Sequence, residues 1–270
     1  MSKIIGILGC GWLGFPLAKS FLQEDYSILG STSTKEKIDC FKDAGIIPFV
    51  ISLEENIIKG NIDSFLNSIT VLIIAIPPKL NRNLEDSYVK KMQLLHVAIK
   101  NNSIKKIVFI SSISIYGNAS GSLTENTIPR PETESAKQLL IAENIFSEDT
   151  TLQTTIIRFG GLIGKDRRPI NRLSGKVNLP NGNFPVNLIH LNDCISLVKA
   201  VVKNDFWNEI INGVNPNHPS KKEYYQLEAI KRELKPPTFI TNELEGGKTI
   251  ISVQTDRLKN FAYTSSICTK

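Results

Sequence analysis

Residues 3–14 read KIIGILGCGWLG, and this stretch decides the fold of the chain. Its first half is short, apolar and rich in β-branched residues, which is typical of a strand buried on both faces in a parallel sheet. Its second half is a glycine-rich turn, and residues 15–23 form a plausible helix. A strand, a G-x-G-x-x-G turn and a helix in this order predict a dinucleotide-binding site.

Each glycine of this turn meets a different physical demand. Gly9 permits the tight turn, Gly11 lets the backbone approach a pyrophosphate, and Gly14 lets the helix pack closely on the strand. The N–H groups at the helix start hold phosphate without needing a cation. We therefore predict that the turn, including Trp12 and Leu13, binds the cofactor. The alternative is a glycine-rich turn in an ordinary α/β domain.

Composition places the chain among globular proteins. It has 270 residues, of which 41% are hydrophobic and 21% charged, and a net charge of +6. No basic cluster with interleaved aromatic residues indicates nucleic-acid binding. The four cysteines are scattered, which favours reduced thiols. The N-terminal apolar run is too short for a signal peptide, and no stretch approaches the roughly 20 apolar residues that span a bilayer. We expect a cytoplasmic protein.

Strands and helices alternate along the first two-thirds of the chain. This alternation implies right-handed crossovers and a doubly wound parallel sheet, so we predict an α/β fold of the Rossmann type. After the first strand and helix, the predicted strands are 26–31, 46–51, 70–76, 106–111 and 154–159, and the predicted helices are 35–44, 62–68, 83–100, 134–146, 192–203 and 220–234.

The regularity ends after Gly164, where proline and asparagine residues cluster between 168 and 187. We therefore expect a dinucleotide-binding domain over residues 1–163, with strands of its sheet continuing in places beyond it. Residues 164–270 are expected to form mainly a small C-terminal substrate lobe.

The segment after the second predicted strand favours NADP over NAD. An NAD site usually has an acid there, about 20 residues after the glycines, which accepts a hydrogen bond from the ribose 2′-hydroxyl. Here residues 31–37 read STSTKEK, and the acid Glu36 comes too late. The hydroxyls of Thr32 and Ser33 and the charge of Lys35 suit a 2′-phosphate instead. The other interpretation is that residues 31–34 cap the next helix.

Two prolines end the fourth predicted strand. Residues 70–76 read TVLIIAI, and Pro77 and Pro78 follow, where a ladder of hydrogen bonds cannot continue. We include Ile76 and Pro77 among the predicted cofactor-binding residues.

Four further motifs occur in order along the chain. Residues 111–117 read SSISIYG, residues 131–143 read PETESAKQLLIAE, residues 158–164 read RFGGLIG, and residues 187–193 read NLIHLND. These motifs resemble those of the extended short-chain dehydrogenase/reductases, the NAD(P)-dependent epimerase/dehydratase family. The resemblance spans nearly the whole chain and implies a Rossmann fold, a nicotinamide cofactor and a small polar substrate, such as a sugar nucleotide.

The chain departs from that family in two places. Leu8 occupies the first glycine position of the family's G-x-x-G-x-x-G turn. In the second motif, counting back from Glu143 places Ser135 where the family has its catalytic Tyr and Leu139 where it has its Lys. Neither side chain can act as a general acid or base at neutral pH. Ser112 stands at the family's catalytic Ser position.

Ser112 and Tyr116 are the predicted catalytic residues. Tyr116 follows Ser112 by four residues and offers a substitute proton donor, although in the family it is usually a packing residue. The three histidines are far apart, so we expect no metal site.

We expect an NADP-dependent oxidoreductase or epimerase-type enzyme, with a non-catalytic NADP-binding regulatory or structural protein as the alternative. The expected partner is a small-molecule substrate, with no nucleic acid and no membrane. The oligomeric state stays open between a monomer and a homodimer.

Overall fold

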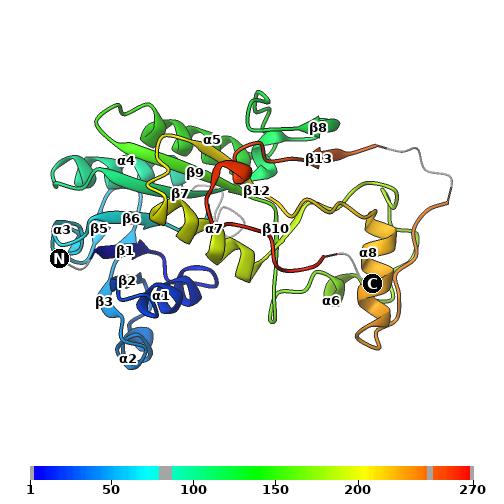
Figure 1. Ribbon diagram of the computed structural model, residues 1–270, viewed down its shortest axis with the longest axis horizontal. Helices are drawn as coiled ribbons and strands as arrows, with labels where there is room; N and C mark the ends of the chain where they lie inside the picture. Colours follow the sequence, from blue (N-terminus) through cyan, green and yellow to red (C-terminus); the bar gives the residue numbers. More distant parts are fainter. Residues whose placement is uncertain (1–2, 79–86, 242–245, 268–270) are drawn as a thin grey trace.

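The computed structural model describes residues 3–78, 87–241 and 246–267, and its centre is a seven-stranded parallel sheet (Figure 1). The strand order is β12-β9-β7-β6-β1-β2-β3. This is the predicted doubly wound α/β fold, with a seventh strand that the sequence did not reveal. The strands are β1 (Ile4–Leu8), β2 (Ser27–Thr32), β3 (Ile47–Val50), β6 (Val71–Ile74), β7 (Lys106–Ser112), β9 (Gln153–Phe159) and β12 (Ile210–Gly213).

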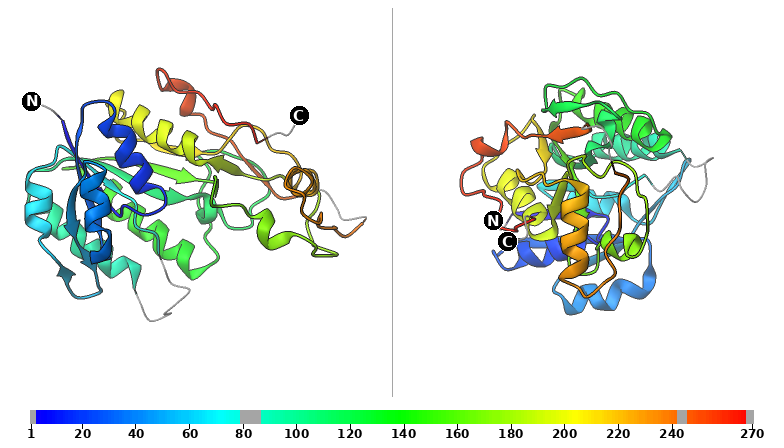
Figure 2. Two further views of the ribbon diagram at one scale, coloured as in Figure 1. Left: turned by 90° about the horizontal axis from the view of Figure 1, so that it is seen from below. Right: turned by 90° about the vertical axis from the view of Figure 1, so that its right-hand side faces the viewer.

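Helices cover both faces of this sheet, as the two views of Figure 2 show. One layer contains α1 (Gly14–Leu22), α2 (Ile38–Asp43) and α7 (Leu191–Lys203), and the opposite layer contains α3 (Ile62–Asn67), α4 (Tyr88–Lys100) and α5 (Glu134–Ser147). The predicted helix over 35–44 is divided into a 3-10 turn, η1 (Lys35–Lys37), and α2. Part of the predicted helix over 83–100 lies outside the described residues, which resume at 87.

The alternation of side chains along each buried strand creates two hydrophobic cores. On β6, Val71 and Ile73 pack with α1 and α7, whereas Leu72 and Ile74 pack with α4 and α5. Successive strand residues point to opposite faces, so a continuous apolar run is needed when both faces are covered. This is why β6 is an uninterrupted run of Val, Leu and Ile.

Smaller elements extend the sheet at its carboxyl edge. Two parallel pairs, β10 (Gly161–Ile163) with β11 (Leu188–His190) and β8 (Gly121–Leu123) with β13 (Lys248–Ile250), lie beyond the strand ends. The helices α6 (Ile170–Leu173) and α8 (Lys221–Ile230) lie at the end of the molecule remote from β1 (Figure 1). The remaining elements are the antiparallel pair β4 (Ser52–Leu53) and β5 (Ile58–Lys59), and two 3-10 turns, η2 (Ile113–Tyr116) and η3 (Thr255–Arg257).

Two elements from beyond residue 163 return to the central sheet. Strand β12 pairs with β9, and α7 covers the sheet beside α1. The packing is therefore continuous across residue 163. The division into a cofactor-binding part before this residue and a substrate lobe after it stays a prediction. Within the described ranges, no helix is long and apolar enough to cross a bilayer.

Candidate functional site

The glycine turn follows β1 at the point where the strand order reverses. Strand β1 lies between β2 and β6, so the connection from β1 leads to one side of the sheet and the later strands lie on the other. In open α/β sheets, ligands bind at such a point, outside the carboxyl ends of the strands. The turn, the end of β2 and the end of β6 therefore border one candidate site.

Packing within the protein explains two of the three glycines. Gly9 has a φ of +104°, in the region that favours glycine, and its amide donates to the Ser31 hydroxyl at 2.9 Å. A Cβ on Gly14 would collide with the carbonyl oxygen of Gly9. Gly9 therefore forms the tight turn and Gly14 keeps α1 close to β1, as the sequence predicted.

Gly11 is different, because a Cβ built on it meets no atom within 4 Å among the described residues. It is exposed, and its φ lies outside the left-handed region. The amides of Trp12 and Leu13, at the start of α1, donate to nothing in the described part of the chain. The backbone at Gly11 thus faces open space beside unused N–H donors, an arrangement suited to an anion.

The end of β2 supplies hydroxyls and a lysine. The Thr32 hydroxyl accepts from the Thr34 amide at 3.1 Å, which shapes the turn into η1. Ser33 and Lys35 are exposed. The Ser31 hydroxyl, which binds the Gly9 amide, is buried. Sequence analysis missed this contact. The position of Ser31 near the end of β2, the strand beside β1, was the signal that could have revealed it.

The end of β6 lies against the glycine turn. A Cβ on Gly9 would meet the Ile76 side chain at 3.0 Å, and the carbonyl of Ile76 accepts from the Tyr88 hydroxyl at 2.8 Å. Pro77 is exposed just beyond. The structure therefore brings Ile76 to the predicted cofactor-binding turn.

Ser112 ends β7 at the same edge of the sheet. It is partly exposed, and its hydroxyl accepts from the Ser114 amide at 3.1 Å, so it caps the 3-10 turn η2. Lys248, from β13, donates to the carbonyls of Ile113 and Gly117 at 3.3 and 2.6 Å. Burial lowers the pKa of Lys248, and the charge of Glu132 opposes that shift. Sequence analysis missed Lys248, because no motif connects β13 to the segment after Ser112.

Tyr116 lies in the interior. Its side chain is fully buried, and its hydroxyl contacts Asn212 at 3.0 Å and accepts from Arg158 at 2.9 Å. Burial raises the pKa of Tyr116. This geometry disfavours the prediction that Tyr116 gives a proton to a substrate, and it favours the packing role.

Arg158 and Glu143 form a buried ion pair beneath Ser112. Their side chains are 4% and 1% exposed, and Nη2 lies 2.8 Å from Oε2. The Ser111 hydroxyl also donates to Glu143, and Ser111 is paired with Arg158 across β7 and β9. The pair therefore joins α5 to two central strands.

The two positions at which the family has its catalytic Tyr and Lys lie on α5. Leu139 is 4% exposed and packs in the core between the sheet, α4 and α5. Ser135, one turn earlier, is partly exposed. The described residues contain no group of three His, Cys, Asp or Glu side chains that could hold a metal.

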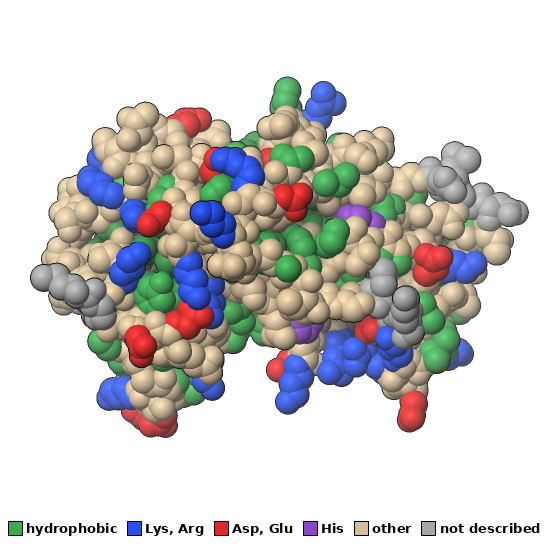
Figure 3. Space-filling model, viewed as in Figure 1, with side chains coloured by type: hydrophobic (Ala, Val, Ile, Leu, Met, Phe, Trp, Pro, Cys, Tyr) green, Lys and Arg blue, Asp and Glu red, His purple; other side chains and the backbone are tan. Residues whose placement is uncertain are grey.

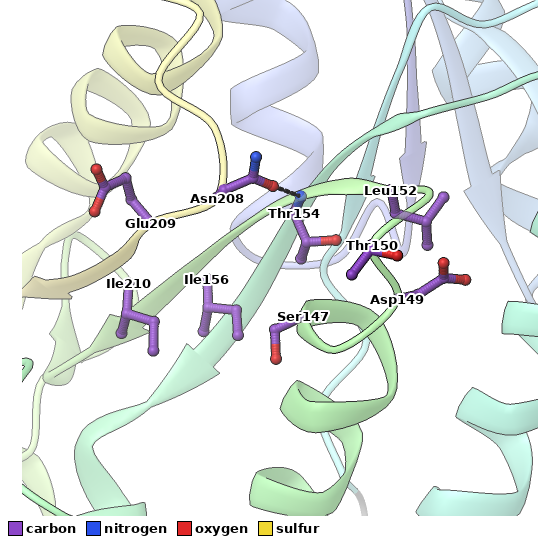
Figure 4. A pocket seen from close by; sticks show the side chains of 9 residues that line it. All are labelled: Ser147, Asp149, Thr150, Leu152, Thr154, Ile156, Asn208, Glu209 and Ile210. Carbon is purple, nitrogen blue, oxygen red and sulfur yellow. Dashed lines mark hydrogen bonds between the residues drawn. The ribbon is translucent and has the colours of Figure 1, made fainter.

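A cavity of about 350 Å³ lies at the opposite edge of the sheet (Figure 4). It is bordered by the amino ends of β9 and β12 and the end of α5, so it is separate from the glycine turn. Its lining combines Ile156 and Ile210 with a polar rim that includes Asn208, which accepts from the Thr154 amide at 3.2 Å. No residue predicted from the motifs lines it.

Comparison with known proteins places the chain in a family. No protein-family model matches it. The chain is 30% identical over 248 residues to protein YeeZ of Escherichia coli strain K12, a match that covers 91% of this chain and 89% of the relative. The chain belongs to the YeeZ family.

Solved structures share the fold of this YeeZ-family chain. The UDP-glucuronic acid 4-epimerase of Bacillus cereus in complex with NAD has a TM-score of 0.79 at 19% identity, over 98% of this chain and 93% of the epimerase. The UDP-N-acetylglucosamine 4-epimerase of Bacillus cereus has a TM-score of 0.80 at 17% identity, over 98% and 96%. The predicted Rossmann fold is confirmed, and it is the fold of these epimerases.

Proposed function

We propose that this chain binds a nicotinamide dinucleotide, with preference for NADP, and that it is an oxidoreductase or epimerase-type enzyme acting on a small polar substrate of the sugar-nucleotide class. The observation that supports this most directly is the open space at Gly11. Packing explains Gly9 and Gly14, but nothing within the described chain requires glycine at position 11. A ligand that comes close to the backbone explains it.

The residues around this space fit a dinucleotide. The amides of Trp12 and Leu13 have no acceptor among the described residues and are available to a pyrophosphate, and α1 adds the positive end of its dipole. Ile76 and Pro77, after β6, form the adjoining wall. When bound, the nicotinamide donates or accepts hydride. Ser112 would orient a substrate hydroxyl or carbonyl beside it, because β7 ends at the same edge of the sheet.

The end of β2 supports the phosphorylated cofactor. The Bacillus cereus UDP-glucuronic acid 4-epimerase was solved with NAD. In this chain, there is no carboxylate between the end of β2 and the start of η1. Ser33 and Lys35 are exposed where the adenosine ribose of a bound dinucleotide would lie. Charge-assisted hydrogen bonds to a 2′-phosphate would favour NADP.

The substrate class rests on the fold neighbours. Both Bacillus cereus proteins are named for UDP-sugars, and the fold similarity extends over 98% of this chain, including the elements beyond β9. We extend that class to this chain as part of the proposal.

A non-catalytic role is the second candidate, and α5 favours it. Leu139 contributes to the core at the position that a lysine holds in the family, and Ser135 lacks an acidic proton. Tyr116 is buried and bonded to Arg158 and Asn212. If no other group transfers the proton, the chain would bind NADP without turnover.

The Gly11→Val variant tests cofactor binding. Because Gly11 has no neighbour within 4 Å of a Cβ, the variant should fold normally but obstruct the pyrophosphate. We expect the affinity for NADPH, measured by calorimetry, to fall at least 100-fold while the circular dichroism spectrum is unchanged. Equal affinity in a folded variant would refute the proposed site. A screen of NADPH oxidation with carbonyl and sugar-nucleotide substrates separates the enzyme from the non-catalytic candidate.

A further inference from the structure

A hairpin at residues 164–167, distant in the sequence from the glycine turn, packs against that turn. Gly164 and Arg167 exchange backbone hydrogen bonds of 3.0 and 3.2 Å, which close a tight turn after β10. A Cβ on Gly164 would lie 3.0 Å from the Trp12 ring, so the hairpin backbone rests directly on that ring. The Arg167 guanidinium carbon lies 5.3 Å from the ring centroid, a cation–π arrangement.

The Arg167 charge has no acidic partner. In the described part of the chain, its side chain makes neither an ion pair nor a hydrogen bond. The surrounding segment, residues 165–176, has five Lys or Arg residues and one acid. Figure 3 shows Lys and Arg side chains gathered near α6, which is part of this segment. An arginine held over an aromatic ring without a carboxylate is available to an anionic ligand.

Trp12 connects this charge to the proposed cofactor site. Its backbone amide follows Gly11 and donates to nothing in the described part of the chain, and the Arg167 guanidinium lies over its ring. The tryptophan side chain has two rotatable bonds, and its contact with Gly164 restricts the ring. The geometry therefore keeps Arg167 beside Trp12, the residue that follows Gly11 in the glycine turn.

We propose that Arg167 is a cofactor-binding residue whose guanidinium, positioned by Trp12, binds the pyrophosphate of the dinucleotide. This inference rests on the proposed function and adds to it: the cofactor is held by the glycine turn and also by the hairpin after β10. The pyrophosphate is common to NAD and NADP, so the contribution of Arg167 is the same for both. Lys35, at the end of β2, discriminates between them.

Calorimetric titration of the full chain with NADH and NADPH tests this assignment. We expect Arg167→Met to weaken the binding of both cofactors about tenfold, equivalent to 1.4 kcal/mol. Arg167→Lys should retain part of the affinity, because it keeps the charge but loses the planar guanidinium. Arg172→Met, which removes a charge from the same segment on α6, is the matched control and should bind as the wild type does.

Each outcome decides the inference. A tenfold loss for both cofactors with Arg167→Met, and none with Arg172→Met, supports it. Loss for NADPH alone would assign Arg167 to the 2′-phosphate and overturn the pyrophosphate contact. Unchanged affinities, or equal losses in both variants, would also overturn it. If the wild type binds neither cofactor, the proposed function fails and this inference fails with it. Arg167 is exposed, so melting temperatures should not change.

Discussion

Removal of the Arg158 side chain should destabilise the protein strongly. Glu143 is 1% exposed, and in Arg158→Met it loses three hydrogen bonds from the guanidinium, at 3.3, 3.2 and 2.8 Å. The Tyr116 hydroxyl also loses a donor at 2.9 Å. Breaking a buried pair by removing one partner costs about 3–5 kcal/mol, since an uncompensated charge remains inside. At roughly 2 °C per kcal/mol for a chain of this size, the melting temperature should fall by about 6–10 °C.

Urea unfolding followed by circular dichroism measures this loss. The double variant Glu143→Leu, Arg158→Met removes both charges and should be more stable than Arg158→Met alone. Lys42→Met breaks an exposed pair with Asp39, whose side chains are 62% and 91% exposed, and should change stability by less than about 0.5 kcal/mol. The reasoning is wrong if Arg158→Met loses less than about 1 kcal/mol, or if the double variant is the least stable of all.

Three further predictions concern the cofactor, the reaction and acid stability. Lys35→Glu should reduce the preference for NADPH over NADH at least tenfold in calorimetric titrations, and an unchanged ratio would contradict the NADP assignment. Ser112→Ala should lower any NADPH turnover about tenfold or more, through loss of a hydrogen bond to the substrate; undiminished turnover would remove Ser112 from the site. Hydrogen bonds from Thr151, and then from His96 and Lys100, hold the pKa of Asp149 well below its usual range. The stability that this carboxylate contributes is present above its unfolded pKa of about 3.9 and is lost as the pH falls through and below that value. Asp149→Asn should therefore narrow the difference in urea midpoint between pH 7 and about pH 3, and an equal difference in both proteins would show that Asp149 does not contribute.

Much of the fold was predictable because the central strands have distinctive composition. The run at 70–76 is apolar throughout, and two prolines end it, so β6 could be placed to within two residues at each end. Strand β12 was not predicted, because Ile210–Gly213 has only two apolar residues, followed by Asn212 and a glycine. Its place at the edge of the sheet depends on pairing with β9, and local sequence does not contain that information.

The candidate site also has a part that the sequence predicted and a part that it did not. Gly9, Gly11 and Gly14 were recognisable because they belong to one short turn, so that their spacing in the sequence determines where they lie relative to one another. The partners of the turn after Ser112 and of Trp12 were not, since Lys248 and Arg167 reach them from distant segments through contacts that follow no periodic pattern. The role of Tyr116 depended on burial, which became visible only once Arg158 and Asn212 were placed around its hydroxyl.

The contact of Lys248 with the turn after Ser112 also has a consequence for the order of folding during synthesis. Its ammonium binds carbonyls that precede it by 135 and 131 residues in the sequence. Such distant contacts form slowly, and the first domain segments to leave the ribosome fold before later ones are made. The nascent chain can complete β1 to β9 while the turn at Ile113 still lacks its cation. The turn after Ser112 therefore reaches its final structure after the central sheet, when β13 has emerged and paired with β8.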